Sequence, residues 1–342
     1  MTDLIALAAR YRTVAVVGLA KNTGKTVTVN YLIAGANRSG LKLALTSTGR
    51  DGETADILSA LPKPMIHLPG GALLATAAPS LGRGTARLEI LEVTGIANAL
   101  GEIVIARVRE PGTVEVSGPE RTEDLRSIID CLQEHADLVL IDGALDRIAP
   151  SAPSVTKGAV LATGAALGGD MKRVVDSTVH TARVLLTPVA DLPPGQAAAL
   201  IESGKTAVQN DKGAVKVLPL FTAIDAPVEI LDYLDSEYKR LLVGGAFSDE
   251  LADLLLGAAG RVPGLEVVVR DGTRIFVEPR RWQRLLRSGA AVKVVEPINL
   301  IAITVNPLDP GRKQLPGKEL VSALKQLLPE LLIFDPLAEG GA

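Results

Sequence analysis

The stretch TVAVVGLAKNTGKTVTVNYL, residues 13–32, constrains the fold of this chain more than any other. Apolar β-formers lead into Gly18, a short polar loop follows, and the residues from Lys25 onward favour a helix. A buried strand that runs through a glycine loop into a helix is typical of α/β proteins with a parallel sheet. Such a loop aims backbone N–H groups and a helix N-terminus at an anion. We therefore expect an α/β fold with a phosphate-binding loop at residues 18–26.

The loop differs from the usual pattern G-x-x-x-x-G-K-[ST] by one residue. Five residues, in place of four, separate Gly18 from Gly24. The chemical requirements are kept, because Lys25 can reach terminal phosphates and the Thr26 hydroxyl can bind Mg²⁺. The residues that we expect to bind nucleotide are Gly18, Lys21, Asn22, Thr23, Gly24, Lys25, Thr26 and Val27.

A second copy of the triplet, Gly204-Lys205-Thr206, serves as a control within the same chain. No strand precedes it, and the residues before it read as a helix that ends at a glycine. We expect this copy to cap a helix and to bind no phosphate.

Acidic residues follow two other predicted strands, and a phosphate-binding loop needs carboxylates to hold its metal ion and orient the nucleophile. Asp142 comes directly after the strand LVLI, where a metal-holding aspartate is expected, although an end cap for the strand is also compatible. The segment TSTGRDGET, 46–54, either forms a switch-like loop, with Asp51 or Glu53 near Mg²⁺ or the nucleophile, or forms an ordinary turn. Glu92 is a further candidate for the same edge of the sheet.

At 342 residues the chain exceeds what one core usually holds, so we expect two domains. Strand–helix alternation runs to about residue 228, which predicts a nucleotide-binding domain at 1–228 and a smaller α/β recognition domain at 229–342. Thr122 is the expected cap of a helix, and Asp271-Gly272 is the expected turn of a hairpin. The predicted strands of the first domain are 13–18, 41–47, 86–95, 136–143, 158–164, 182–188 and 215–221.

Composition excludes several classes of function. The net charge of −3 gives no field that favours nucleic acid or an anionic membrane. The longest apolar segments fall short of about 20 residues, so no membrane span is expected. One cysteine and three scattered histidines leave no metal-ligand spacing, and the opening segment lacks the pattern of a secretory signal. We expect a cytoplasmic protein.

The basic helix around Trp282, with Arg280, Arg281, Arg284 and Arg287, is either a solvated face or a docking surface for a partner.

The five-residue spacing resembles that of dethiobiotin synthetase and its relatives, a branch of the P-loop nucleoside triphosphatases. Lys21 invites comparison with the extra lysine of the partitioning ATPases in that branch, and its other interpretation is a solvated loop lysine. Over most of its length the chain also resembles the small subunit of the lysine 5,6-aminomutase reactivase, on the segments VAVVGLAKNTGKT, LTSTGRDGE, LIAITVNPLDP and LIFDP. That resemblance implies two partners, a larger ATPase subunit and a client aminomutase that carries adenosylcobalamin and pyridoxal phosphate.

Together these features predict a protein that binds ATP and Mg²⁺ and hydrolyses the nucleotide. Lys25 holds phosphate, Thr26 and Asp142 hold the metal, and Asp51 or Glu53 orients the nucleophile. The first hypothesis for its use is a reactivase or chaperone subunit. The alternatives are a small-molecule ligase or kinase of dethiobiotin-synthetase type and a nucleotide-binding module without turnover. The sequence leaves a homo-oligomer open.

Overall fold

The computed structural model describes residues 4–49, 65–143, 149–168, 170–192, 196–220, 223, 227–309 and 314–338. The chain divides into two compact units. Unit 1 combines Met1–Val179 with Asn299–Ala342, and unit 2 is His180–Ile298. Unit 2 is therefore inserted into the sequence of unit 1.

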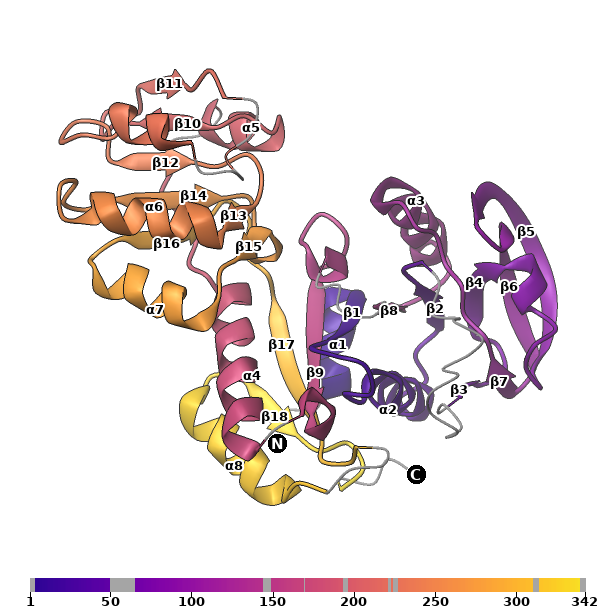
Figure 1. Cartoon of the computed structure of the whole chain (residues 1–342). Coiled ribbons are helices and arrows are strands. Elements are labelled where there is room, and N and C mark those ends of the chain that lie inside the picture. The colour runs from indigo at the N-terminus through magenta and orange to yellow at the C-terminus, as the bar shows by residue number, and fades with distance from the viewer. Residues whose placement is uncertain are drawn as a thin grey trace. The chain divides into compact units, whose positions relative to one another are not determined.

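Unit 1 is built on a nine-stranded sheet in the order β18-β17-β9-β1-β8-β2-β4-β6-β5 (Figure 1). Neighbours are parallel from β18 through β4, and β6 is antiparallel to both β4 and β5. The strands are β1 Thr13–Gly18, β2 Leu43–Ser47, β4 Leu73–Ala77, β5 Arg87–Asn98, β6 Gly101–Glu110, β8 Leu138–Asp142, β9 Gly158–Gly164, β17 Leu300–Asn306 and β18 Leu332–Phe334. A separate antiparallel pair joins β3 Ile66–Leu68 to β7 Gly112–Val114. The expected α/β class with a mainly parallel sheet is confirmed.

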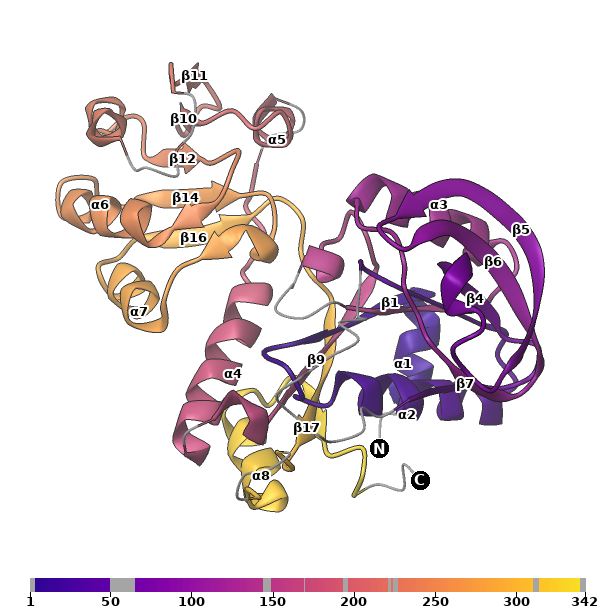
Figure 2. The same ribbon diagram turned by 45° about the vertical axis from the view of Figure 1, so that its right-hand side comes forward.

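Helices cover both faces of this sheet, and Figure 2 shows α3 on the side away from α1 and α2. The core on the α1 and α2 side joins Leu4 of α1 and Leu32 of α2 to Val14, Val16 and Leu140 of the central strands. The helices of unit 1 are α1 Leu4–Tyr11, α2 Lys25–Arg38, α3 Thr122–Gln133 and α8 Gly317–Leu327, with short 3₁₀ turns η1 Ala78–Ser80, η2 Ala149–Ser151 and η3 Ala165–Leu167. β1 is buried on both faces, and this burial fixes the position of the chain where it enters residues 18–25.

Unit 2 has its own five-stranded sheet, in the order β11-β10-β12-β14-β16, and a short parallel pair of β13 and β15. Its core packs Phe247, Leu251 and Leu255 against Val267 and Val292. The strands are β10 Ala207–Gln209, β11 Val215–Val217, β12 Arg240–Leu242, β13 Phe247–Ser248, β14 Glu266–Val269, β15 Ile275–Phe276 and β16 Ala291–Val294. The helical segments are α5 Gln196–Glu202, η4 Val228–Tyr233, α6 Asp249–Ala259, η5 Gly272–Arg274 and α7 Pro279–Arg287, and α4 Met171–Leu185 runs from unit 1 into unit 2.

The two units correct the boundary that the sequence predicts at residue 228. The last segment of the chain returns to the first sheet, because β17 pairs with β9 and β18 pairs with β17. Residues 180–228, which include β10 and β11, belong instead with unit 2. Alternation of strands and helices does not show which strand a later segment of the chain pairs with. The alternation breaks near residue 228, so the sequence predicts a domain boundary there, although the chain later returns to the first sheet.

Three local expectations are also corrected. The strand expected at 182–188 is wrong, because residues 182–185 form the last turn of α4. Val174, Thr178 and Ala182 are buried at intervals of four residues along this helix. The carboxylate of Asp271 accepts bonds from the N–H and hydroxyl of Thr273, and this 3₁₀ turn replaces the expected hairpin. Its flanking strands β14 and β15 lie in different sheets.

The third correction concerns the start of α3. Arg121 is the residue in extended conformation before the helix, Thr122 is already helical, and no side chain caps this end.

Candidate functional site

The Gly18–Thr26 loop joins the end of β1 to the first residues of α2. All six residues of β1 are buried, and α2 packs onto the sheet through Val29, Leu32 and Ala36. The N–H of Leu19 donates to the carbonyl of Ala162, so the loop begins in register with β9. The loop therefore lies at the carboxyl ends of the central parallel strands, which is where open α/β sheets bind ligands.

Both glycines of the loop are required by its geometry. A Cβ on Gly18 would lie 2.7 Å from the hydroxyl oxygen of Thr23 and 2.9 Å from Cγ of Lys25. Gly24 has φ +94°, in the left-handed region that favours glycine. The contact with Gly18 also shows that the Lys25 side chain runs back along the loop, and only 8% of Lys25 is exposed.

The N-terminus of α2 has no side-chain cap, a feature that it shares with α3 but not with α6. Gly24 is the N-cap, no side chain caps this end, and the first turn contains no acidic residue. In α6, by contrast, the hydroxyl of Ser248 accepts the N–H of Leu251, and two acidic residues occupy the first turn. The α2 N-terminus and the side chain of Lys25, its first residue, thus lie beside the same loop, which favours an anion there.

The other expected binding residues occupy different positions in the loop. Asn22 adopts a left-handed conformation with φ 59°, and the Thr23 hydroxyl donates to the carbonyl of Ala20 across 2.9 Å. Lys21 is exposed, and Thr26 and Val27 are half-buried in the first turn of α2. Asn22 and Gly24 thus give the loop two left-handed residues just before α2 begins at Lys25.

Asp142 is brought to the loop by strand pairing. It is the last residue of β8 and lies opposite Val16 of β1 in a parallel pair. Its side chain is buried, with 3% of the residue exposed, and its carbonyl accepts the N–H of Thr48. Thr48 and Asp142 therefore end neighbouring strands at the same edge of the sheet as Gly18.

The other carboxylates expected near the loop have different outcomes. Asp51 and Glu53 lie outside the described residues. Glu92 is on β5, at the far edge of the sheet, five strands from β1. At about 4.8 Å per strand this separation is roughly 24 Å, so the expectation that Glu92 joins the phosphate edge is wrong. The sequence pattern misled because β5 is the outer strand of an antiparallel hairpin with β6.

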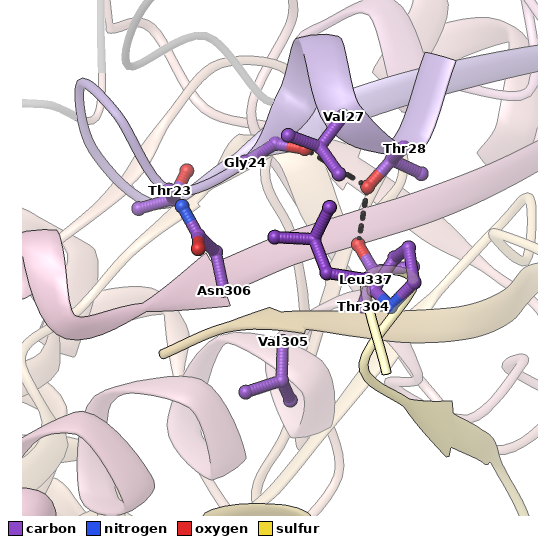
Figure 3. A pocket seen from close by; sticks show the side chains of 9 residues that line it. Thr23, Gly24, Val27, Thr28, Thr304, Val305, Asn306 and Leu337 are labelled. Carbon is purple, nitrogen blue, oxygen red and sulfur yellow. Dashed lines mark hydrogen bonds between the residues drawn. The ribbon is translucent and has the colours of Figure 1, made fainter. Parts of the chain in front are cut away.

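A small pocket lies on the flank of the loop (Figure 3). The space among its atoms is about 170 Å³, open solvent included, and it is lined by Thr23, Gly24, Val27, Thr28, Thr304, Val305, Asn306, Pro336 and Leu337. No part of that space admits a water-sized sphere, so the hollow does not hold a nucleotide in this conformation.

Asn306 is the residue of this site that sequence reasoning did not select. Its side-chain amide donates to the carbonyl of Asn22 at 3.2 Å. The signal was present, because Asn306 is a polar residue at the end of the otherwise apolar, buried strand β17. Its relevance depends on β17 pairing with β9 beside β1, which the sequence did not reveal.

The second Gly-Lys-Thr triplet is a helix end, as expected. Gly204 has φ +77° just past α5, and the N–H of Lys205 returns to the carbonyl of Leu200. The same three residues thus occupy the start of a helix at 24–26 and the end of one at 204–206.

Among the residues that the structure describes, the remaining charged groups suggest no alternative site. Within the described part of the chain, no three His, Cys, Asp or Glu side chains are grouped so as to hold a metal ion. On α7, Arg281 pairs with Asp249, Asp253 and Glu278, while Arg280, Arg284 and Arg287 are exposed. None of the described helices is both long and apolar enough to cross a membrane.

Comparisons of the chain with protein-family models, curated proteins and solved structures found no match.

Proposed function

We propose that this protein binds ATP with Mg²⁺ at the Gly18–Thr26 loop. The observation that carries the proposal is the convergence at one edge of the sheet of the uncapped α2 N-terminus, the buried Lys25 side chain and two glycines that admit no side chain. An ammonium group together with a helix N-terminus binds a phosphate chain more tightly than the ammonium group alone.

The residues at this edge also suit Mg²⁺. The Thr26 hydroxyl and the Asp142 carboxylate supply hard oxygen ligands, and Mg²⁺ is usually held by one or two such groups together with substrate phosphates and water. A site with two protein oxygens is thus sufficient when the nucleotide supplies the rest. The metal would neutralise the charge on the phosphates, while Lys25 and the loop amides orient them.

For the use of the nucleotide, we propose the reactivase or chaperone role that the sequence resemblance implies, with a larger ATPase subunit and a cobalamin- and pyridoxal-phosphate-dependent aminomutase as partners. In this role basal hydrolysis is slow and rises with the client. A ligase of dethiobiotin-synthetase type is less favoured, because it would need a substrate pocket beside the terminal phosphate, lined by residues 46–53 and Glu92–Thr94. Those last residues lie on the far strand β5.

The experiment that tests nucleotide binding is calorimetric titration with Mg²⁺–ATP of the wild type and two matched variants. Lys25→Ala removes the buried cation and should weaken binding by about 100-fold or more. Lys205→Ala makes the same change in the second triplet and should leave the affinity unchanged. Wild-type affinity in Lys25→Ala would overturn the proposed site. Measurable binding without hydrolysis, even with the aminomutase present, would favour the module without turnover over the reactivase.

A further inference from the structure

The Gly18–Thr26 loop holds two residues in the left-handed region on either side of Thr23. Asn22 has φ 59° and Gly24 has φ 94°. Glycine adopts this conformation freely, whereas Asn22 does so at an energetic cost, although asparagine tolerates it better than most residues. Alternation of this kind turns successive N–H groups toward one point and forms an anion-binding nest. A conformation with such a cost persists only where surrounding groups fix it.

One side chain from outside the loop contacts both left-handed residues. The Asn306 amide donates to the carbonyl of Asn22 at 3.2 Å. A Cβ on Gly24 would lie 2.8 Å from the Cβ of Asn306, so the two residues are packed as closely as a glycine allows. Figure 3 shows the Asn306 side chain directed at the loop beside Thr23. The bond from Thr23 to Ala20 lies within the loop and does not reach the carbonyl of Asn22.

Asn306 is itself held firmly. Its side-chain oxygen accepts the N–H of Leu308, which fixes the orientation of the amide. Its backbone lies against Gly164 of β9, where a Cβ would be 1.9 Å from the Asn306 carbonyl oxygen. Thr304 lies two residues before Asn306, on the same face of β17. Its hydroxyl forms a 2.7 Å hydrogen bond with the hydroxyl of Thr28, near the start of α2. The strand is thus fixed to both the loop and the helix that follows it.

We propose that Asn306 is a positioning residue, which holds the Gly18–Thr26 loop in the conformation that receives the phosphate chain. This inference rests on the proposed function. Because the loop is held before the ligand arrives, binding does not have to order it, and the affinity for phosphate is higher. Asn306 acts on the phosphates through Asn22 and Gly24, so its effect is independent of the nucleoside base.

The test compares Asn306→Ala with Asn299→Ala, using Mg²⁺–ATP, Mg²⁺–GTP and inorganic tripolyphosphate as probes. Asn299 is a matched control, because its amide donates to the Lys157 carbonyl at 2.8 Å just before the other end of β17. A neutral hydrogen bond has a modest net value, so Asn306→Ala should weaken ATP and tripolyphosphate alike by about 3- to 10-fold. The ratio of ATP to GTP affinity should stay that of the wild type, and Asn299→Ala should bind all three probes as the wild type does.

Two results would overturn the inference. One is wild-type affinity for tripolyphosphate and ATP in Asn306→Ala. The other is a loss confined to ATP, with a changed ratio of ATP to GTP, which would make Asn306 a contact for the base. Asn306→Ser, whose side chain ends one bond earlier, replaces the alanine variant if that does not fold. If the wild type binds neither ATP nor tripolyphosphate, the proposed function fails first, and that outcome is distinct from both.

Discussion

Asp142 of β8 lies opposite Val16 of β1, two residues before Gly18. Because of this parallel pairing, the buried carboxylate of Asp142 and the Gly18–Thr26 loop lie at the same edge of the sheet. The pairing is also fixed from the other side, since Ser47 of β2 lies opposite Asp142. The relation between the carboxylate and the loop is therefore a property of three adjacent buried strands.

The first prediction concerns Asp142. Asp142→Asn keeps the shape of the side chain and removes its charge, so the gain in ATP affinity on adding Mg²⁺ should fall about tenfold or more. ATP titrations with and without Mg²⁺ measure this gain. Asp137→Asn is the control, because Asp137 accepts the N–H of Lys42 just before the start of β8 and an asparagine oxygen can do the same. An undiminished Mg²⁺ effect in Asp142→Asn would exclude this carboxylate from the metal site.

The second prediction separates strain from function at two glycines. Gly24→Ala forces a side chain into the left-handed region and within 2.8 Å of Asn306. Gly40, past the end of α2, has φ +68° and no atom within 4 Å of an added Cβ. Each change should lower the free energy of unfolding by about 1–2 kcal/mol from backbone strain, as measured by denaturant unfolding.

Only Gly24→Ala should also abolish ATP binding, because it alone displaces the loop. Retention of wild-type affinity by Gly24→Ala, or an equal loss of affinity in Gly40→Ala, would contradict this account of the loop.

The third prediction is a pH dependence of stability that arises in unit 2. Burial lowers the pKa of His180 below its usual value of 6.5, against smaller upward effects of its bond to the Val277 carbonyl and of the nearby Asp249. The imidazole also packs against the Trp282 ring system, with the two rings nearly perpendicular. Because the pKa is lower in the folded state, the unfolded state takes up the proton first as the pH falls. Stability should therefore be complete above about pH 6.5 and decrease as the pH falls toward the lower folded pKa.

Urea unfolding at pH 7.5 and pH 5.5 measures this effect. His180→Gln should reduce the difference between the two midpoints, while His135→Gln, at an exposed position on unit 1, should not. If the His180 variant shows the full wild-type difference, another group is responsible.

The strand, the loop and the helix at residues 13–38 were predictable because local signals agree there. Apolar β-formers, two glycines and a helix-favouring segment from Lys25 onward each favour the observed structure. The contrast between Lys25 and Lys205 was predictable for the same reason, since the flanking elements differ while the triplets are identical.

The contribution of β17 was not predictable, because it depends on pairing between strands about 140 residues apart in sequence. Both the place of Asn306 in the site and the insertion of unit 2 follow from that pairing. Glu92 illustrates the converse. It lies in a strand with a suitable local pattern, yet that strand forms the antiparallel edge of the sheet. Local patterns therefore predicted the elements of the site that are contiguous in sequence, and only the structure revealed the element that returns from a distance.

The most direct measurement is a crystal structure of the protein with Mg²⁺ and a non-hydrolysable ATP analogue. We predict that the phosphates lie within hydrogen-bond distance of the amides of the Gly18–Thr26 loop and of the Lys25 ammonium, with Mg²⁺ on the Thr26 hydroxyl and next to Asp142. Density for the nucleotide at any other place, or none at saturating concentration, would contradict the account.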